Sequence, residues 1–287
     1  MPTDPPPVAE RPVLAGVNGS DTATALVDFA AVEAARYDAP LTLVHVWPGR
    51  YTGAFRGRSA MPSPADAQRL LSLAAARACL AVPGLRVRNR LLDGGAGALL
   101  EEASAGARLL IVGHRDQPDA RSAWGSTTAY LAYRSACPLL IRRGPARDAG
   151  PVVVAVSLRR TGDETLAFAF ERAALVGCPL SVVHMWTTSR ADAEQSLGEA
   201  LRDAAARFPA VPVEPLVVSA SEMPRTIEQS LRRGRLMVAG TGRGGSFAEL
   251  LCNARDPHLG TPATCPTVLV PQVGPKDPGG PGPATRR

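Results

Sequence analysis

The sequence predicts an α/β protein made of two tandem domains, each with a doubly wound parallel sheet. Three observations lead to this prediction. The chain has 287 residues, a length that suits two domains of ordinary size. Its two halves repeat one sequence pattern. Within each half, short apolar runs rich in β-branched residues alternate with alanine-rich segments of helical periodicity, as in parallel sheets covered by helices on both faces.

The internal repeat is most evident around one strand-like segment. The sequence PLTLVHVW at residues 40–47 returns as PLSVVHMW at residues 179–186. Three further pairs of segments keep the same order along the chain: 12–17 with 151–156, 109–113 with 236–240, and 137–141 with 265–269. A repeat of this length indicates two copies of one folding unit.

Each unit is expected to alternate strands and helices and to end on a fifth strand. In the first unit a strand near residues 12–17 precedes a helix at 22–38, which Ser20 or Asp21 is suited to cap. Helical spacing predicts the buried stripe of that helix: Leu26, Phe29, Ala30, Ala34 and Tyr37. The later elements are predicted as helices at 64–81, 96–105 and 124–136 and strands at 40–47, 85–92, 108–113 and 138–141.

The domain boundaries follow from loop-forming residues. The first domain is placed at residues 11–143 and the second at 151–271, with a linker at 144–150. Glycine and proline dominate after residue 271, so we expect residues 272–287 to form a disordered tail. Residues 1–10 are likewise expected to be disordered. One doubly wound sheet is expected in each domain.

Composition narrows the class of protein. No run reaches the ~18 apolar residues of a membrane span, and the first residues lack the basic and apolar regions of a signal peptide. We therefore expect a cytoplasmic protein without a membrane partner. The net charge is +6, but arginine is spread along the whole chain and Lys276 is the only lysine, so we do not expect a nucleic-acid partner.

The five cysteines are expected to be reduced, structural thiols. They are odd in number and form no C-x-x-C pair, which argues against a disulfide framework and against a zinc site. The five are Cys79, Cys137, Cys178, Cys252 and Cys265.

A candidate binding site lies where the strands of the first unit end. In an open parallel sheet, ligands bind at the carboxyl ends of the strands, where the strand order reverses. Segments from three strands are expected to meet there. The predicted binding residues from these segments are Val17, Asn18, Ser20, Val46, Gly113 and His114.

A second part of the same site is a predicted helix start. Gly125, Ser126 and Thr127 open the helix that follows the Gly113 loop. Glycine lets a phosphate approach the backbone, and free N–H groups at a helix start favour an anion. The residues alone also allow an ordinary helix cap without a ligand.

These motifs resemble the universal stress protein family over about residues 11–271, as a tandem of two such domains. Members of that family have a first strand ending Val-x-Val-Asp-Gly-Ser, a second strand ending Val-His-Val, and Cys-Pro before the last strand. Those that bind ATP carry Gly-x2-Gly-x9-Gly-(Ser/Thr) after the fourth strand. The resemblance implies that the first domain binds an adenine nucleotide, with ATP as the expected ligand. It implies that Asn18 contacts the adenosine part, that Gly113 is the first motif glycine, and that Gly125 and Ser126 form the phosphate-binding pair.

The sequence departs from the family pattern in both units. In the first, Asn18 replaces the family's aspartate but keeps an amide oxygen, Asp116 stands at the second glycine, and the loop is one residue short. In the second, Asn253 and Ala254 replace the phosphate-binding pair, and Pro257 falls where the next helix should continue. The second unit is therefore not expected to bind a nucleotide in the family's manner.

The resemblance also implies how the two units meet. Units of this family pair through their last strands, so residues 138–141 and 266–270 are expected to lie side by side across a pseudo-two-fold axis. This pairing would protect two sheet edges. Whether two chains also form a homodimer is left open.

Three functions remain open at this point. The first is a stress-response regulator that binds an adenine nucleotide in the first domain and presents a changed surface to an unknown protein partner. The second is a nucleotide-independent scaffold with degenerate sites. The third, an ATP-hydrolysing enzyme, is not expected, because no metal-binding carboxylates accompany the glycines. His45 and His184 are interpreted as hydrogen-bonded residues in separate sheets and not as a catalytic or metal pair.

Overall fold

The first half of the chain forms the predicted five strands and four helices. The computed structural model describes residues 11–20, 23–47, 63–113, 126–142, 147–156, 158, 162–241 and 265–271. The strands of the first unit are β1 (Val13–Gly16), β2 (Leu41–Trp47), β3 (Val87–Asp93), β4 (Leu109–Gly113) and β5 (Leu139–Arg142). Its helices are α1 (Ala23–Arg36), α2 (Pro64–Ala81), α3 (Ala96–Ser104) and α4 (Ser126–Arg134).

The second half repeats this order in the part that is described. Its strands are β6 (Val152–Val156), β7 (Leu180–Met185), β8 (Val213–Val218), β9 (Leu236–Gly240) and β10 (Thr267–Val270). Its helices are α5 (Gly162–Val176), α6 (Arg190–Arg207) and α7 (Met223–Arg233). The expected break in the helix at Pro257 lies outside the described residues, as do the two predicted disordered ends at 1–10 and 272–287.

The local sequence accounts for the clearest helix boundary. Ser63 caps α2: its hydroxyl accepts a hydrogen bond from the Asp66 N–H at 3.2 Å, and the Asp66 carboxylate accepts one from the Ser63 N–H at 3.1 Å. This reciprocal pair satisfies two N–H groups that a helix start leaves without partners. Pro64 at the first helical position lacks such an N–H and starts the helix without cost. The predicted range 64–81 is therefore confirmed.

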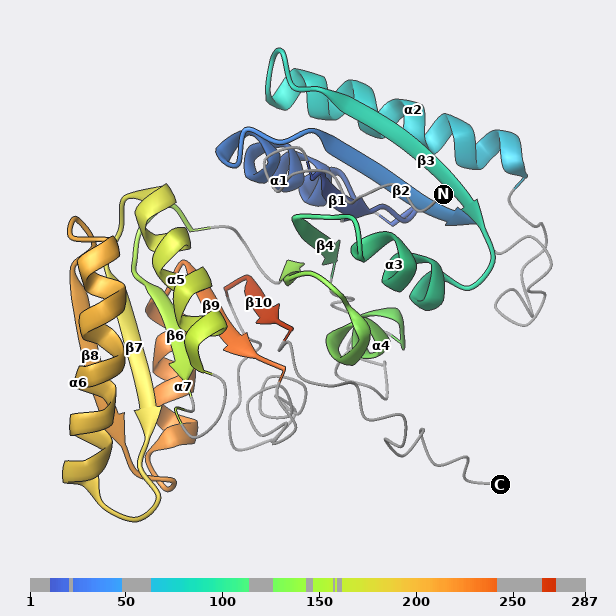
Figure 1. The fold of residues 1–287 in the computed structure, drawn as a ribbon. Helices are drawn as coiled ribbons and strands as arrows, with labels where there is room; N and C mark the ends of the chain where they lie inside the picture. Colours follow the sequence, from blue (N-terminus) through green and yellow to red (C-terminus); the bar gives the residue numbers. More distant parts are fainter. Residues whose placement is uncertain are drawn as a thin grey trace, which may run out of the picture.

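All ten strands form one sheet, in the order β3-β2-β1-β4-β5-β10-β9-β6-β7-β8. Within each unit every described strand pair is parallel, and the two units join where β5 and β10 pair antiparallel (Figure 1). Leu139, Leu140 and Ile141 align with Leu269, Val268 and Thr267. The predicted pairing of the last strands is confirmed. The expectation of two separate sheets was wrong, because this pairing makes them continuous.

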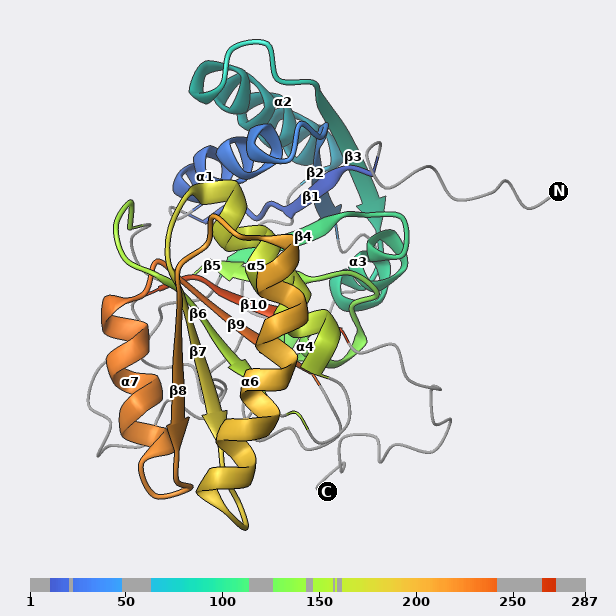
Figure 2. The same cartoon turned by 60° about the vertical axis from the view of Figure 1, so that its left-hand side comes forward.

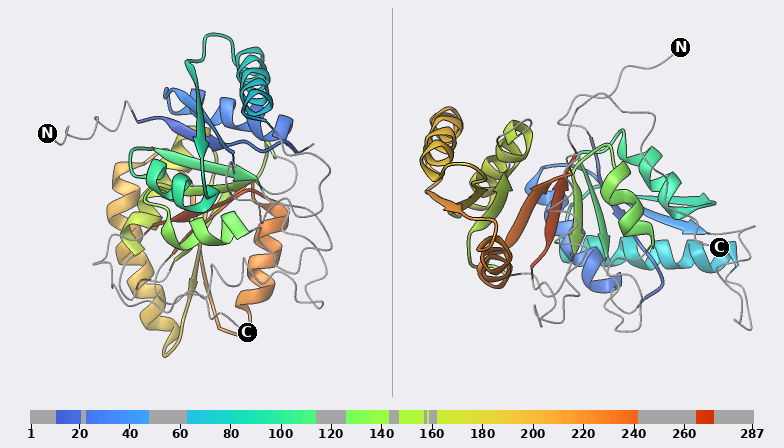
Figure 3. Two further views of the ribbon diagram at one scale, coloured as in Figure 1. Left: turned by 90° about the vertical axis from the view of Figure 1, so that its right-hand side faces the viewer. Right: turned by 90° about the horizontal axis from the view of Figure 1, so that it is seen from below.

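Helices cover both faces of the sheet, as the two buried clusters show (Figure 2). One cluster lies under α1, α2, α5 and α6, and the other under α3, α4 and α7. The first cluster contains Leu26 and Val13 of the first unit together with Phe170 and Val268 of the second. The two units therefore share one hydrophobic core across the β5–β10 junction, and Figure 3 shows the two halves side by side along the sheet.

The buried stripe of α1 differs from the prediction at five positions. Leu26, Ala30 and Ala34 are buried as expected, whereas Phe29 and Tyr37 are only partly buried. Val27, Ala31 and Glu33 are buried although the prediction did not include them, and Glu33 has no exposed surface. A carboxylate is seldom buried unless it is paired.

Glu33 is paired across the junction with Arg172 of α5. Nη2 of Arg172 donates a hydrogen bond to Glu33 Oε1 at 2.5 Å, and Nη1 of Arg36 donates to the same oxygen at 2.5 Å. The Arg172 side chain is only 5% exposed. Burial by itself lowers the pKa of Arg172. The neighbouring charge of Glu33 and contacts with Tyr37 raise this pKa by more than burial lowers it, so the guanidinium stays charged.

The two partners occupy the same position in the repeat. Glu33 and Arg172 are 139 residues apart, and the same offset relates His45 to His184. Residues at one repeat position face each other only where they lie near the pseudo-two-fold axis. The two copies have thus diverged to opposite charges at this point of contact between the units.

Replacing Glu33 with Gln is expected to destabilise the fold by about 3 kcal/mol, because the Arg172 charge would stay buried without a carboxylate. Urea unfolding measures this change. Glu194→Gln is the matched control: it breaks an exposed ion pair with Arg190 on α6 and is expected to leave the midpoint unchanged. Equal effects of the two variants would contradict a structural role for the buried pair.

The cysteines are expected to differ in reactivity. Burial raises the pKa of Cys137 to about 12, whereas Cys79 is exposed on α2. Because the thiolate is the reactive form, iodoacetamide at pH 8 should modify Cys79 of the native protein and leave Cys137 intact. Peptide mass spectrometry resolves the two sites. Modification of Cys137 at the rate of Cys79 would contradict its burial.

Candidate functional site

The carboxyl ends of β1 and β4 form the point where the strand order reverses. The chain leaves β1 toward β2 and β3 on one side and returns to β4 and β5 on the other. Register pairs Ala15 of β1 with Leu43 of β2 and with Ile111 of β4. The segments that follow these strands are therefore neighbours at one edge of the sheet, as predicted. Crevices of this kind are the usual ligand sites of open parallel sheets.

A compact polar turn follows β1. The Val17 N–H donates to the Val44 carbonyl at 2.8 Å, which holds the chain against β2 for one more residue. The side-chain oxygen of Asn18 then accepts hydrogen bonds from the Ser20 hydroxyl at 2.6 Å and from the Ser20 N–H at 3.3 Å. Both residues are exposed. Because two bonds already engage that oxygen, the amide N–H groups of Asn18 remain to contact a ligand.

His45 supports this turn from β2. Its Nδ1 lies 2.7 Å from the Val17 carbonyl, and in the second unit Nδ1 of His184 lies 3.1 Å from the Val156 carbonyl. Each histidine thus partners the carbonyl at the end of the neighbouring first strand. The interpretation of His45 and His184 as hydrogen-bonded strand-end residues is confirmed. They nevertheless belong to one sheet, in which six strands separate β2 from β7.

The end of β4 lies close to the start of α4. Thr128 Oγ1 donates to the Gly113 carbonyl over 3.5 Å, a long hydrogen bond that places the first turn of α4 near the end of β4. Gly113 is exposed, and a Cβ built on it would meet only Leu26 Cδ2 at 3.9 Å. Packing among the described residues therefore does not require a glycine here.

The structure brings together most of the predicted site residues that it describes. Val17, Asn18 and Ser20 follow β1, and Gly113 ends β4 on the adjacent strand. Val46 lies near the end of β2, where it is partly buried against the core. Ser126 and Thr127 are the first two residues of α4, and Thr127 is partly buried. His114, Asp116 and Gly125 lie outside the described residues, as do Asn253 and Ala254 of the second unit.

Comparison with known proteins identifies this arrangement. Residues 10–143 match the model of the universal stress protein family. The first unit is therefore a universal stress protein domain, and proteins named as universal stress proteins are similar to most of the chain. A universal stress protein of Mycolicibacterium smegmatis is 26% identical over 291 residues, which cover 91% of this chain and 97% of that protein. The similarity to that relative thus extends over both units of the tandem.

Solved structures agree with the fold. A universal stress protein of Archaeoglobus fulgidus superimposes with a TM-score of 0.68 at 14% identity and covers 92% of this chain and 97% of that one. A universal stress protein in complex with cAMP is 27% identical, covers 46% of this chain and 94% of that one, and has a TM-score of 0.36. The first of these likenesses establishes a common architecture for the tandem.

Other kinds of site are not found in the described part of the molecule. No helix there has the length and apolar character needed to cross a bilayer. No group of three histidine, cysteine, aspartate or glutamate side chains within the described ranges is arranged to hold a metal ion. The sequence analysis did, however, miss the charged cluster around Glu33 and Arg172. Its only signal was the pair of opposite charges at one repeat position.

The two strand-end histidines are expected to contribute unequally to stability. His184 is 7% exposed, so His184→Leu leaves the Val156 carbonyl buried without a partner and should cost about 1–3 kcal/mol. His45 is partly exposed, so water can replace it in His45→Leu and the loss should be smaller. Chemical denaturation of both variants measures the difference. A larger loss for His45→Leu would contradict this assignment.

Proposed function

We propose that this protein binds one adenine nucleotide in its first unit and acts as a stress-response regulator. The observation that carries the proposal is the exposed Gly113 at the strand-order reversal, next to the start of α4. Packing does not require a glycine at this position. A glycine at position 113 is explained if a ligand approaches the backbone there, because a side chain would block that approach.

The start of α4 supplies the phosphate-binding part of the proposed site. The first N–H groups of a helix have no partner within the helix, and the helix dipole gives that end a partial positive charge. Ser126 and Thr127 are the first residues of α4, and Gly125 precedes them. Phosphate groups at this end would lie close to Gly113, because Thr128 of the same helix turn reaches its carbonyl.

The turn after β1 supplies the adenosine part of the proposed site. Its geometry is held by the Asn18–Ser20 hydrogen bonds and by His45 behind Val17. In this geometry Asn18 meets the ligand as a hydrogen-bond donor through its amide group. The family's aspartate would act there as an acceptor, so the nucleotide contacts are expected to differ at this position.

The second unit is proposed to have no such site. Its first strand ends at Val156 and is followed by Ser157 and Leu158 in place of a polar Asn-Gly-Ser turn. Ordering of the first unit by a nucleotide would change the surface that an unknown protein partner contacts. The proposal includes binding without turnover, so an ATPase assay should remain at the background rate.

A nucleotide-independent scaffold is the second candidate. One observation favours it: the Asn18 oxygen is already engaged by Ser20, so the turn is complete without a ligand. In this alternative the crevice is a former nucleotide site that no longer binds a ligand. The ten-stranded sheet then serves only as a scaffold for a protein partner.

Calorimetric titration of ATP into the nucleotide-stripped protein separates the two candidates. One site per chain is expected. Gly125→Asp should weaken ATP binding at least tenfold, because it adds a carboxylate next to the proposed phosphate-binding end of α4 and like charges repel. Gly198→Asp is the matched control: it makes the same change on α6, where an added Cβ meets nothing within 4 Å.

The outcomes have distinct meanings. One ATP site that Gly125→Asp weakens at least tenfold and Gly198→Asp leaves unchanged supports the regulator. No heat and no thermal stabilisation by ATP would support the scaffold. Two sites of equal affinity would contradict the proposed loss of binding in the second unit.

A further inference from the structure

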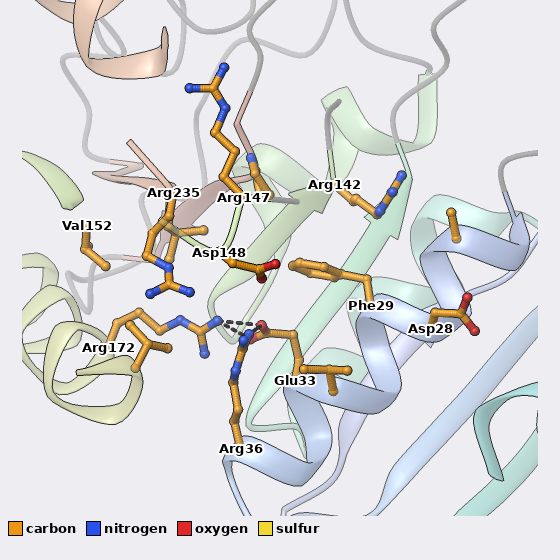
Figure 4. Close-up of a pocket in the computed structure, with 15 residues that line it drawn as sticks. Asp28, Phe29, Glu33, Arg36, Arg142, Arg147, Asp148, Val152, Arg172 and Arg235 are labelled. Atoms are coloured by element: carbon orange, nitrogen blue, oxygen red, sulfur yellow. Dashed lines mark hydrogen bonds and ion pairs between the residues drawn. The ribbon is translucent and has the colours of Figure 1, made fainter. Parts of the chain in front are cut away.

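A cavity of about 330 Å³ lies over the junction between the two units. Its walls come from α1 and α5, from the end of β5, from the linker before β6 and from the start of β9 (Figure 4). Phe29, Val32 and Val176 contribute apolar surface. The volume lies in the usual range of small-molecule pockets.

Arginine dominates the charge of this cavity. Five arginines line it: Arg36, Arg142, Arg147, Arg172 and Arg235. The acidic residues are Asp28, Glu33 and Asp148. Asp28 is already engaged by Arg77, which holds both of its oxygens at 2.6 Å. Glu33 is shared between Arg36 and Arg172.

Three of the arginines have no ion pair among the described residues: Arg142, Arg147 and Arg235. Two come from the strand end and linker that leave the first unit, and the third comes from the second unit. Asp148 is exposed and forms no ion pair within the described ranges. The cavity therefore holds more positive charge than its own carboxylates neutralise.

Buried donors without partners reinforce this charge. Within the described residues, Nη1 of Arg172 and Nε of Arg142 are buried and lack a hydrogen-bond partner. The Arg172 side chain is 95% buried, because only 5% of it is exposed. A buried charged donor without a partner is costly, and folded proteins usually satisfy such groups with protein, water or a ligand. Figure 4 shows Arg172 and Arg235 among the side chains that line the cavity.

We infer that this cavity binds a small anion with two adjacent phosphate groups, either free or carried by a larger molecule. Guanidinium groups bind phosphate oxygens with two parallel hydrogen bonds, and several of them around one cavity match a multiply charged anion. The ligand would contact residues from both units and thereby reinforce the junction. The small volume and the partly apolar lining favour a small molecule over a nucleic acid, which requires an extended basic surface.

The inferred site is separate from the proposed nucleotide site, although the two are close. Gly113 pairs with Arg142 in the sheet, so the cavity begins one strand away from the end of β4. Arg235, at the start of β9, belongs to the cavity alone. Substitution of Arg235 therefore tests the cavity without altering the first unit.

The test is calorimetric titration of the full chain with pyrophosphate at low ionic strength, where exposed charges are least screened. One site per chain is expected. Arg235→Gln should weaken pyrophosphate binding about tenfold, because it removes one charge-assisted contact. Asp148→Asn should strengthen binding, because it removes a like charge from the cavity wall. Opposite effects of these two variants would not follow from a change in stability alone.

Two controls complete the design. Arg225→Gln removes the same charge from an exposed position on α7 and should leave pyrophosphate affinity unchanged. Gly125→Asp should weaken ATP binding at the first unit at least tenfold while preserving pyrophosphate binding, which separates failure of this inference from failure of the proposed function. Thermal melts establish that each variant is folded.

The remaining outcomes are decisive. Absence of pyrophosphate binding, or equal losses in Arg235→Gln and Arg225→Gln, would overturn the inference. Binding of a single-stranded oligonucleotide without binding of pyrophosphate would overturn it in favour of a nucleic-acid surface. In the Gly125→Asp background, ADP binding that depends on Arg235 would identify a nucleotide as the source of the two phosphates, and pyrophosphate binding alone would identify a free anion.

Discussion

The contact between the two units across β5 and β10 organises the rest of this molecule. Antiparallel pairing of these strands makes one ten-stranded sheet and removes two edges that would otherwise be exposed. It also brings α1 and α5 together over the junction, where Glu33 and Arg172 form a buried ion pair. The shared hydrophobic core, the cavity and the relative position of the two units all follow from this one contact.

The ion pair adds selectivity to that contact. The first unit carries Glu33 at the repeat position where the second carries Arg172. Two first units paired in the same way would bring two carboxylates together, and two second units would bring two guanidinium groups together. Like charges in a buried contact are costly, so opposite charges at this position favour pairing of the unlike units within one chain.

The two units share one scaffold but differ in the sequence that follows their first strand. In both, a histidine on the second strand partners the carbonyl at the end of the first strand. Only the first unit then continues into the polar turn of Asn18 and Ser20. Divergence of the loops with retention of the sheet is expected, since loops carry the ligand contacts while the sheet carries the stability.

The sequence by itself determined the architecture of each unit, because repeated apolar runs and capping residues such as Ser63 act locally. It also placed Asn18, Val46 and Gly113 at one edge of a sheet, since parallel strands bring their carboxyl ends together. The family pattern further implied the pairing of the last strands. The tertiary structure decided that the Asn18 oxygen is engaged by Ser20, that Glu33 is buried, and that five arginines surround one cavity. These features depend on contacts between residues far apart in the chain, such as Glu33 and Arg172. Local periodicity and spacing along the sequence do not show which distant residues come into contact.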